Sequence, residues 1–154
     1  MALKPLSTKI KIFGVIFIIA AIALQFTKFY WTEATVLLKD VPLKVLVAKN
    51  VYQQEKGLGG RESLAPYDGM IFQFDFPSRY GFVMRDMEFS IDIVWLNSGV
   101  VVDIAPNVQL EPGVKEADFR RYIPRAEANL VIELQAGWAQ AHGLQIGDRL
   151  VVPG

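Results

Sequence analysis

Four charged residues lie within or beside apolar segments, where a hydrophobic core alone would not need them. Arg85 and Asp86 interrupt one such segment, Asp92 lies in the middle of the next, and Arg61 follows a glycine pair. A planar guanidinium group can hold an anionic group through two parallel hydrogen bonds. We therefore predict a binding surface made of these four residues, in which Arg61 and Arg85 line a cleft and hold an anionic group of a ligand.

The same residues also have a structural interpretation. Arg85 could pair with an acid from another element and lock the sheet. A buried carboxylate is costly unless it is partnered, so Asp92 should accept hydrogen bonds from Arg85, Arg61 or backbone N–H groups. Glu133, inside a later apolar segment, raises the same question. For both acids, a solvent-facing position on a one-sided sheet is the other possibility.

Paired carboxylates are the main catalytic alternative. Two carboxylates about 5 to 10 Å apart would suit glycoside hydrolysis, and Asp86 and Asp92 would share one face of an unbroken strand. The single histidine, His142, has no neighbouring nucleophile motif and no ligand spacing around it. We therefore predict no metal site and no cofactor, and we assign no catalytic residue.

Short strands must hold these residues in place. Alternating apolar and polar side chains indicate strands. The predicted strands are two within residues 35–48 and one each within 69–74, 82–87, 89–96, 100–104, 129–134 and 149–152. Short helices are expected over residues 51–58, with Asn50 as N-cap and Gln53 as its capping-box partner, and over residues 137–142. Residues 111–128 read as an exposed loop.

These patterns predict the fold class. The helical stretches are too brief to build βαβ crossovers, so the sequence predicts a mainly β fold: an antiparallel β-sandwich or jelly-roll-like barrel with short helical insertions.

An apolar N-terminal segment predicts export. Ile12–Leu24 is apolar and follows three lysines. In one interpretation it is a cleaved signal peptide, with Ala21-Ile22-Ala23 as the cleavage site. In the other, Ile10–Trp31 is an uncleaved transmembrane helix of 22 residues, about 33 Å long. We favour the anchor, because the apolar stretch continues through the candidate cleavage site.

The sequence therefore predicts two parts. Residues 1–31 would be a membrane anchor or signal peptide, and residues 32–154 a β domain on the extracytoplasmic side, secreted if the first part is cleaved. Residues 1–31 contain four lysines and no acid, whereas the remainder has 12 Lys and Arg against 16 Asp and Glu. This acidic body argues against a nucleic-acid partner, since phosphate binding needs a basic face. There is no cysteine, and hence no disulfide or thiolate metal site.

The order and spacing of several short motifs resemble one known family. The matching residues are Val47-Ala48, Glu55-Lys56-Gly57-Leu58, Arg61, Leu64, Gly69-Met70-Ile71-Phe72-Gln73-Phe74, Met84-Arg85, Ile91-Asp92-Ile93, Val101-Val102, Pro106, Ile132-Glu133-Leu134-Gln135-Ala136-Gly137 and Gly143-Leu144-Gln145-Ile146-Gly147-Asp148. Over about residues 34–152 the chain resembles the DUF192 family. The resemblance implies a compact, mainly β domain of jelly-roll type, often exported or membrane-attached, with no established activity.

The chain departs from the family pattern in one segment. Where the family usually has Phe-Trp-Met-Lys-Asn-Thr, this sequence has Phe82-Val83-Met84-Arg85-Asp86-Met87. The tryptophan is lost, the amide becomes a carboxylate, and the hydroxyl becomes a thioether. This segment is therefore where we expect the chain to differ from its relatives in what it binds.

Taken together, these observations predict a cell-envelope protein. We expect a non-enzymatic binding or accessory β domain held at the membrane by its N-terminal segment, with an envelope protein or a small anionic or carbohydrate ligand as partner. The alternative is a hydrolase that acts on envelope carbohydrate through paired carboxylates such as Asp86 and Asp92.

Overall fold

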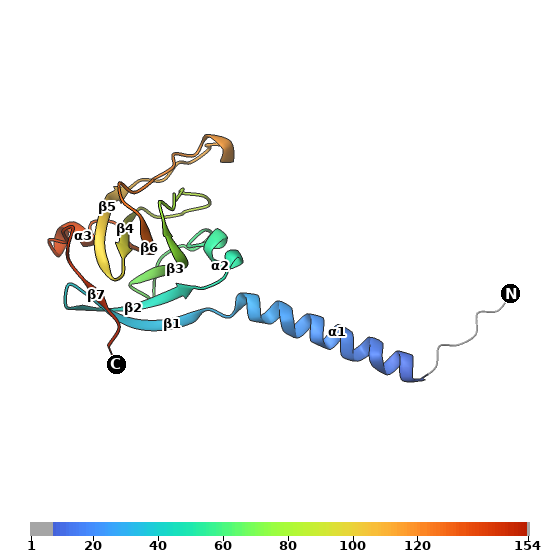
Figure 1. Cartoon of the computed structure of the whole chain (residues 1–154). Helices are drawn as coiled ribbons and strands as arrows, with labels where there is room; N and C mark the ends of the chain where they lie inside the picture. Colours follow the sequence, from blue (N-terminus) through green and yellow to red (C-terminus); the bar gives the residue numbers. More distant parts are fainter. Residues whose placement is uncertain (1–7, 154) are drawn as a thin grey trace. The chain divides into compact units, whose positions relative to one another are not determined.

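The computed structural model describes residues 8–153 (Figure 1). The chain divides into two compact units, Met1–Trp31 and Thr32–Gly154. The first unit contains helix α1 (Thr8–Phe29), and Lys4 of the predicted leader lies outside the described residues. No helix in the described part of the chain is long and apolar enough to cross a membrane. The transmembrane helix therefore remains a prediction from the sequence.

The second unit is mainly β, as predicted. Its strands are β1 (Thr32–Leu38), β2 (Val41–Ala48), β3 (Gly69–Ser78), β4 (Ile91–Asn97), β5 (Val100–Val108), β6 (Ala128–Gln135) and β7 (Leu150–Val151). They form one curled sheet in the order β5-β4-β6-β3-β2-β1-β7 (Figure 1). The two end strands, β5 and β7, meet at one corner of the sheet. There the Leu150 N–H donates to the Gly99 carbonyl at 2.8 Å, and the Val101 N–H donates to the Asp148 carbonyl at 2.9 Å.

The predicted antiparallel sandwich or jelly roll is not confirmed. All seven strands belong to one sheet, and β2 and β3 run parallel, so the sheet is mixed. The physical reason is the connection: α2 (Val51–Lys56) and the chain up to Gly69 carry the backbone from the end of β2 back to the start of β3. A parallel pair needs such a crossover, and here it is built mostly from turns.

Local sequence signals explain the hairpins and the first short helix. Lys39 and Asp40, between β1 and β2, have φ of 51° and 64°, the left-handed values that a tight two-residue hairpin turn needs. The Asn50 side chain caps α2 by accepting from the Gln53 N–H at 2.9 Å, as predicted. The Gln53 side chain accepts from the Lys49 N–H at 2.9 Å. In a standard capping box it would instead accept from the N–H of the N-cap residue, here Asn50.

The predicted strand over residues 82–87 is wrong. Only Phe82 pairs, in an isolated bridge with Tyr122, and Asp86 has a left-handed φ of 52°. The segment instead turns so that the Asp86 carbonyl accepts from the Gly60 N–H at 2.7 Å. Without a continuous strand, the alternation that placed Asp86 and Asp92 on one face does not hold.

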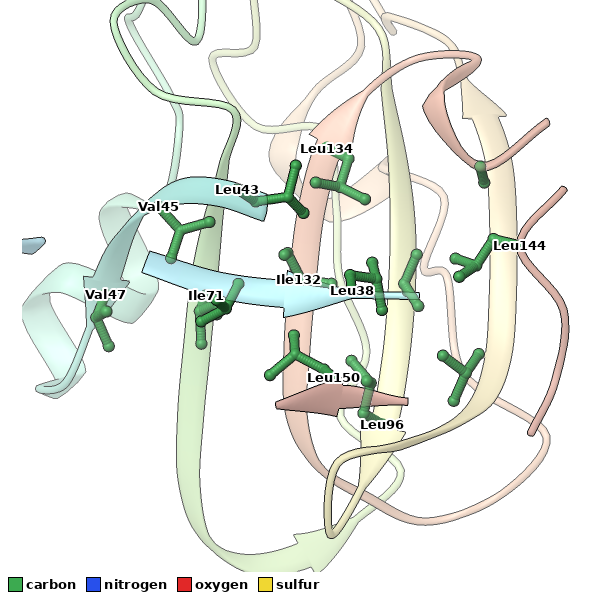
Figure 2. Close-up of a cluster of buried hydrophobic side chains, with 14 residues drawn as sticks. Leu38, Leu43, Val45, Val47, Ile71, Leu96, Ile132, Leu134, Leu144 and Leu150 are labelled. Atoms are coloured by element: carbon green, nitrogen blue, oxygen red, sulfur yellow. The ribbon is translucent and has the colours of Figure 1, made fainter. Parts of the chain in front are cut away.

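The hydrophobic core lies on one face of the sheet. All seven strands contribute side chains to it, among them Val45, Ile71, Leu96, Ile132 and Leu134 (Figure 2). Two further short helical elements lie in the loops: η1 (Glu116–Asp118) after β5 and α3 (Trp138–Ala141) after β6. Ala139 of α3 belongs to the core cluster, so α3 covers part of this face.

The opposite face of the central strands is also buried. The register aligns Phe72 with Val131 and Val131 with Trp95 across β3, β6 and β4. The next row aligns Met70, Glu133 and Ile93. All six residues of these two rows are buried, so this second face has a cover of its own, and the candidate site lies there.

Candidate functional site

A cleft of about 300 Å³ opens on the second face of the sheet. Its walls come from α2 and the glycine turn after it, from β3, and from the two loops that follow β3 and β5. The lining residues are Val51, Gln54, Glu55, Lys56, Gly57, Leu58, Gly59, Phe72, Phe74, Tyr80, Gly81, Phe82, Val83, Arg85, Met87, Glu116, Phe119, Arg121 and Glu133. A cleft of this size accommodates a small organic molecule.

Aromatic rings form much of the cleft wall. The Phe72 and Phe82 rings meet edge to face with centroids 4.9 Å apart, and the Phe74 and Tyr80 rings stack with centroids 3.7 Å apart. Trp95 anchors this wall from the sheet, since its indole N–H donates to the Tyr80 carbonyl at 3.0 Å. The rings are therefore held in place before any ligand arrives.

Two loops that are far apart in the sequence form the outer part of the cleft. Phe82 N–H donates to the Tyr122 carbonyl at 2.9 Å, and Tyr122 N–H donates to the Phe82 carbonyl at 2.8 Å. This reciprocal pair joins the loop after β3 to the loop after β5. It brings Phe119 and Arg121 to the cleft that Arg85 also lines, a grouping that no sequence signal indicated.

Charged side chains surround the cleft. Arg85 forms an ion pair with Glu116, and the side chains are 41% and 67% exposed. Exposed ion pairs contribute little to stability, so the pair can open at small cost. The other charged lining residues are Glu55, Lys56, Arg121 and Glu133.

Glu133 is the one charged lining residue that is buried, with 5% of its surface exposed. Its Oε2 atom is buried and has no hydrogen-bond partner. Burial raises the pKa of this carboxyl from 4.5 to about 8. A strongly perturbed carboxyl group in a cleft is a recognised indicator of a functional site.

The four residues predicted to form a binding surface do not all line one cleft. Arg85 lines the cleft, and Asp86 lines a shallower depression next to it with Tyr52, Glu55 and Lys56. Arg61 lines neither depression. It lies near Tyr67, whose pKa is raised chiefly by a hydrogen bond to Glu33 while the Arg61 charge acts in the opposite direction.

Asp92 is a structural cross-link and lies away from the cleft. It is fully buried on the core face. Its carboxylate accepts from three backbone N–H groups: Asn107 at 2.7 Å, Gly137 at 3.1 Å and Ala139 at 2.7 Å. The partners are thus backbone N–H groups, one of the predicted possibilities, and the bonds tie β4 to the end of β5 and to α3.

A second buried acid, Asp103, is also structural. Burial raises its pKa, but hydrogen bonds from the Arg125 side chain and backbone outweigh this effect, so the pKa is lowered overall. The ion pair joins β5 to the loop before β6 at 2.6 Å. Among the described residues, no cluster of three or more His, Asp or Glu side chains is arranged to hold a metal ion.

Sequence reasoning noticed Glu133 and missed the aromatic residues of the cleft. Phe119 and Arg121 belong to the loop predicted as exposed, where composition gives no sign of a site. Phe72 and Phe82 read as ordinary strand residues. The usable signal was Glu133 itself, a carboxylate between two apolar residues in a central strand.

Comparison with protein families decides where the chain belongs. The model described as "DUF192: Uncharacterized ACR, COG1430" matches residues 34–152. The chain belongs to the DUF192 family. None of the curated proteins compared with it matches significantly. The departure from the usual DUF192 motif includes Val83, Arg85 and Met87, all of which line the cleft, so this member differs from the family pattern at the candidate site itself.

Two solved structures are similar to this DUF192 chain. One is a "putative transcription regulator" from Sinorhizobium meliloti 1021, with 26% identity and a TM-score of 0.71 over 79% of this chain and 95% of that one. The other is a protein of unknown function from Novosphingobium aromaticivorans DSM 12444, with 25% identity and a TM-score of 0.65 over 79% of this chain and 84% of that one. Both likenesses cover the greater part of each chain.

Replacing Asp92 with alanine tests its structural role. The substitution leaves one buried and two part-buried backbone N–H groups without their acceptor, so the free energy of unfolding should fall by about 2 to 4 kcal/mol. Urea denaturation of the full chain measures the change. The exposed Asp118→Ala variant is the control and should change stability by less than about 0.5 kcal/mol. Equal stability of the Asp92 variant and the unmodified chain would refute the cross-link.

Replacing Glu133 with glutamine should change how stability depends on pH. Between pH 4.5 and about 8, the folded chain holds a proton on Glu133 that the unfolded chain releases. Stability therefore falls as pH rises through this window, by up to about 1.4 kcal/mol per pH unit, and levels off above it. The Glu133→Gln variant has no titrating group at this position, so it lacks this pH-dependent contribution to stability. Its free energy of unfolding relative to the unmodified chain should therefore rise with pH and then become constant.

Denaturation curves from pH 5 to pH 9 measure this difference. Glu127→Gln, which removes an exposed acid just before β6, is the matched control and should show no such trend. A stability difference for Glu133→Gln that stays the same at every pH would contradict the raised pKa.

Proposed function

We propose that the β domain is a non-enzymatic binding module whose cleft takes a small ligand with a flat apolar or ring-shaped face. The observation that carries this proposal is the cleft of about 300 Å³ lined by Phe72, Phe74, Tyr80, Phe82 and Phe119. Aromatic side chains bury a large area and favour stacked or edge-on contacts with a second ring or a sugar face. They therefore supply both affinity and shape selection.

The arginines at the cleft give the ligand a second expected feature. Arg85 and Arg121 both line the cleft, and a guanidinium group suits carboxylate and phosphate groups. Release of Arg85 from Glu116 would allow it to hold an anionic group of the ligand. Arg85 thus keeps its predicted role, and Arg121 takes the role predicted for Arg61.

The carboxylates do not favour hydrolysis. Asp92 is fully buried and its oxygens accept three backbone N–H groups, while Asp86 lies on a turn beside the cleft. These two acids therefore do not converge on one space that could hold a glycosidic bond and a water. We do not propose a nucleic-acid partner either, because residues 32–154 carry more acids than bases.

We further propose that the β domain works outside the cytoplasm, at the cell envelope. The support is the sequence of the first 31 residues, in which lysines precede a long apolar segment. A site next to the membrane would suit an accessory protein that binds a small ligand or an envelope partner.

Binding of small ring compounds to the full chain tests the cleft. Saturation-transfer NMR with phenylacetate, which combines a ring and a carboxylate, should show binding. Phe119→Ala should weaken it about fivefold or more, equivalent to roughly 1 kcal/mol of lost aromatic contact. Arg85→Ala should weaken the binding of phenylacetate more than the binding of benzyl alcohol, the neutral counterpart.

The control for this experiment is Phe76→Ala. Phe76 is 76% exposed and does not line the cleft, so its removal should leave binding unchanged. The proposal fails if no ring compound binds at millimolar concentration, or if Phe76→Ala and Phe119→Ala reduce binding equally.

The proposed location can be checked by fractionation of the cells that produce the protein and by sequencing its N-terminus. We expect the full chain, with its N-terminal segment intact, in the membrane fraction, and a variant that lacks residues 1–31 in the cytoplasm. A mature N-terminus at Leu24 would replace the anchor by a cleaved signal peptide. Recovery of the full chain from the cytoplasm would exclude both.

A further inference from the structure

The side chain of Glu133 has a buried oxygen, Oε2, without a hydrogen-bond partner. Its two neighbours in β6, Ile132 and Leu134, belong to the core on the other face. Across the strands it lies opposite Met70 in β3 and Ile93 in β4, and both are fully buried apolar residues. The side chains directly opposite therefore offer no donor, and Oε2 is left without a partner.

Such a carboxyl group is costly to keep. A buried polar atom without a hydrogen bond costs about 1 to 3 kcal/mol, and an apolar residue would fill the position at no such cost. No protein group donates a hydrogen bond to Oε2 of Glu133. Asp92 and Asp103, in contrast, accept hydrogen bonds from protein groups. Glu133 also differs from these two acids in its position, because it lines the cleft.

The surroundings of Glu133 in the cleft suit a cation. The Phe72 and Phe82 rings line the same cleft, and the faces of aromatic rings attract ammonium groups, most strongly where water is excluded. A carboxylate close to aromatic rings is a favourable combination for a protonated amine, because the two attractions add. An anion at the same place would be repelled by ionised Glu133.

We propose that Glu133 is the acceptor for a protonated amine of the ligand, so that the cleft selects compact, ring-bearing ammonium compounds. This inference rests on the proposed binding function and specifies its ligand class. If the arginines at the rim hold an anionic group of the same molecule, the ligand is zwitterionic, with its amine inside and its acid at the rim.

The amine would ionise Glu133 as it binds. Because burial holds the pKa of the free carboxyl near 8, most of it is protonated at pH 7, and formation of the ion pair releases that proton to solvent. The other titratable groups that line the cleft are Glu55 and Lys56 of α2, Tyr80 and Arg85 after β3, and Glu116 and Arg121 after β5. None of them bonds to Oε2 of Glu133.

The test compares two ring compounds that differ in the polar group. Phenethylamine stays protonated below about pH 10, as a lysine side chain does, and phenethyl alcohol is its neutral counterpart. Isothermal titration calorimetry of the full chain at pH 7, in two buffers of different ionisation enthalpy, gives both the affinity and the protons released. We expect the amine to bind at least tenfold more tightly than the alcohol, with release of close to one proton.

Two variants separate the possible failures. Glu133→Gln keeps the size of the side chain and should abolish both the preference for the amine and the proton release, while alcohol binding persists. Phe119→Ala should weaken the binding of the amine and the binding of the alcohol to the same extent. An urea denaturation curve checks that each variant is folded.

Each outcome bears on one proposal. If the alcohol binds as tightly as the amine and Glu133→Gln changes neither, the amine site is wrong and the binding module stands. If neither compound binds, while the variants are folded and phenylacetate also fails to bind, the binding module itself is wrong. Tight amine binding that survives Glu133→Gln would also overturn the role of Glu133, because the cation would then be held elsewhere.

Discussion

Burial of both faces of the central strands is the constraint on which this structure depends. In β4 every residue from Ile91 to Leu96 is buried, and Val131–Leu134 of β6 are buried as well. One face is covered by strands that curl over it and by α3. The other has no second sheet, so α2 and the loops after β3 and β5 must cover it. Loops cover a flat surface less completely than a sheet does, and the cleft is the part that they leave open.

Burial on both faces also decides what each acid can do. The register places Asp92 opposite Leu134 and Glu133 opposite Ile93, so the two carboxylates lie on opposite faces of neighbouring strands. Asp92 meets the backbone N–H groups of α3 and the end of β5, which satisfy it. Glu133 lines a cleft, and its Oε2 atom has no hydrogen-bond partner. Both acids lie between apolar residues in a central strand, yet Asp92 is a structural cross-link and Glu133 is a candidate ligand contact.

The sequence predicted the features that depend on near neighbours. The two strands within residues 35–48, the cap at Asn50 and the family membership all follow from short motifs. The strand predicted over residues 82–87 failed because alternating apolar residues also suit a turn that buries Met84 and packs against Gly60. The grouping of Arg85 with Phe119 and Arg121 depends on a loop-to-loop backbone pairing between residues 40 positions apart, for which periodicity and composition give no signal.

The reciprocal hydrogen bonds between Phe82 and Tyr122 allow the side chains of the cleft to change without loss of the pairing between the two loops. They fix two loops to each other through backbone atoms, so the pairing does not depend on which side chains the loops carry. Positions such as Val83, Phe119 and Arg121 can then change without disturbing the sheet below. The scaffold can in this way stay constant while the side chains of the cleft vary, and the segment Phe82–Met87 lies where such variation is tolerated.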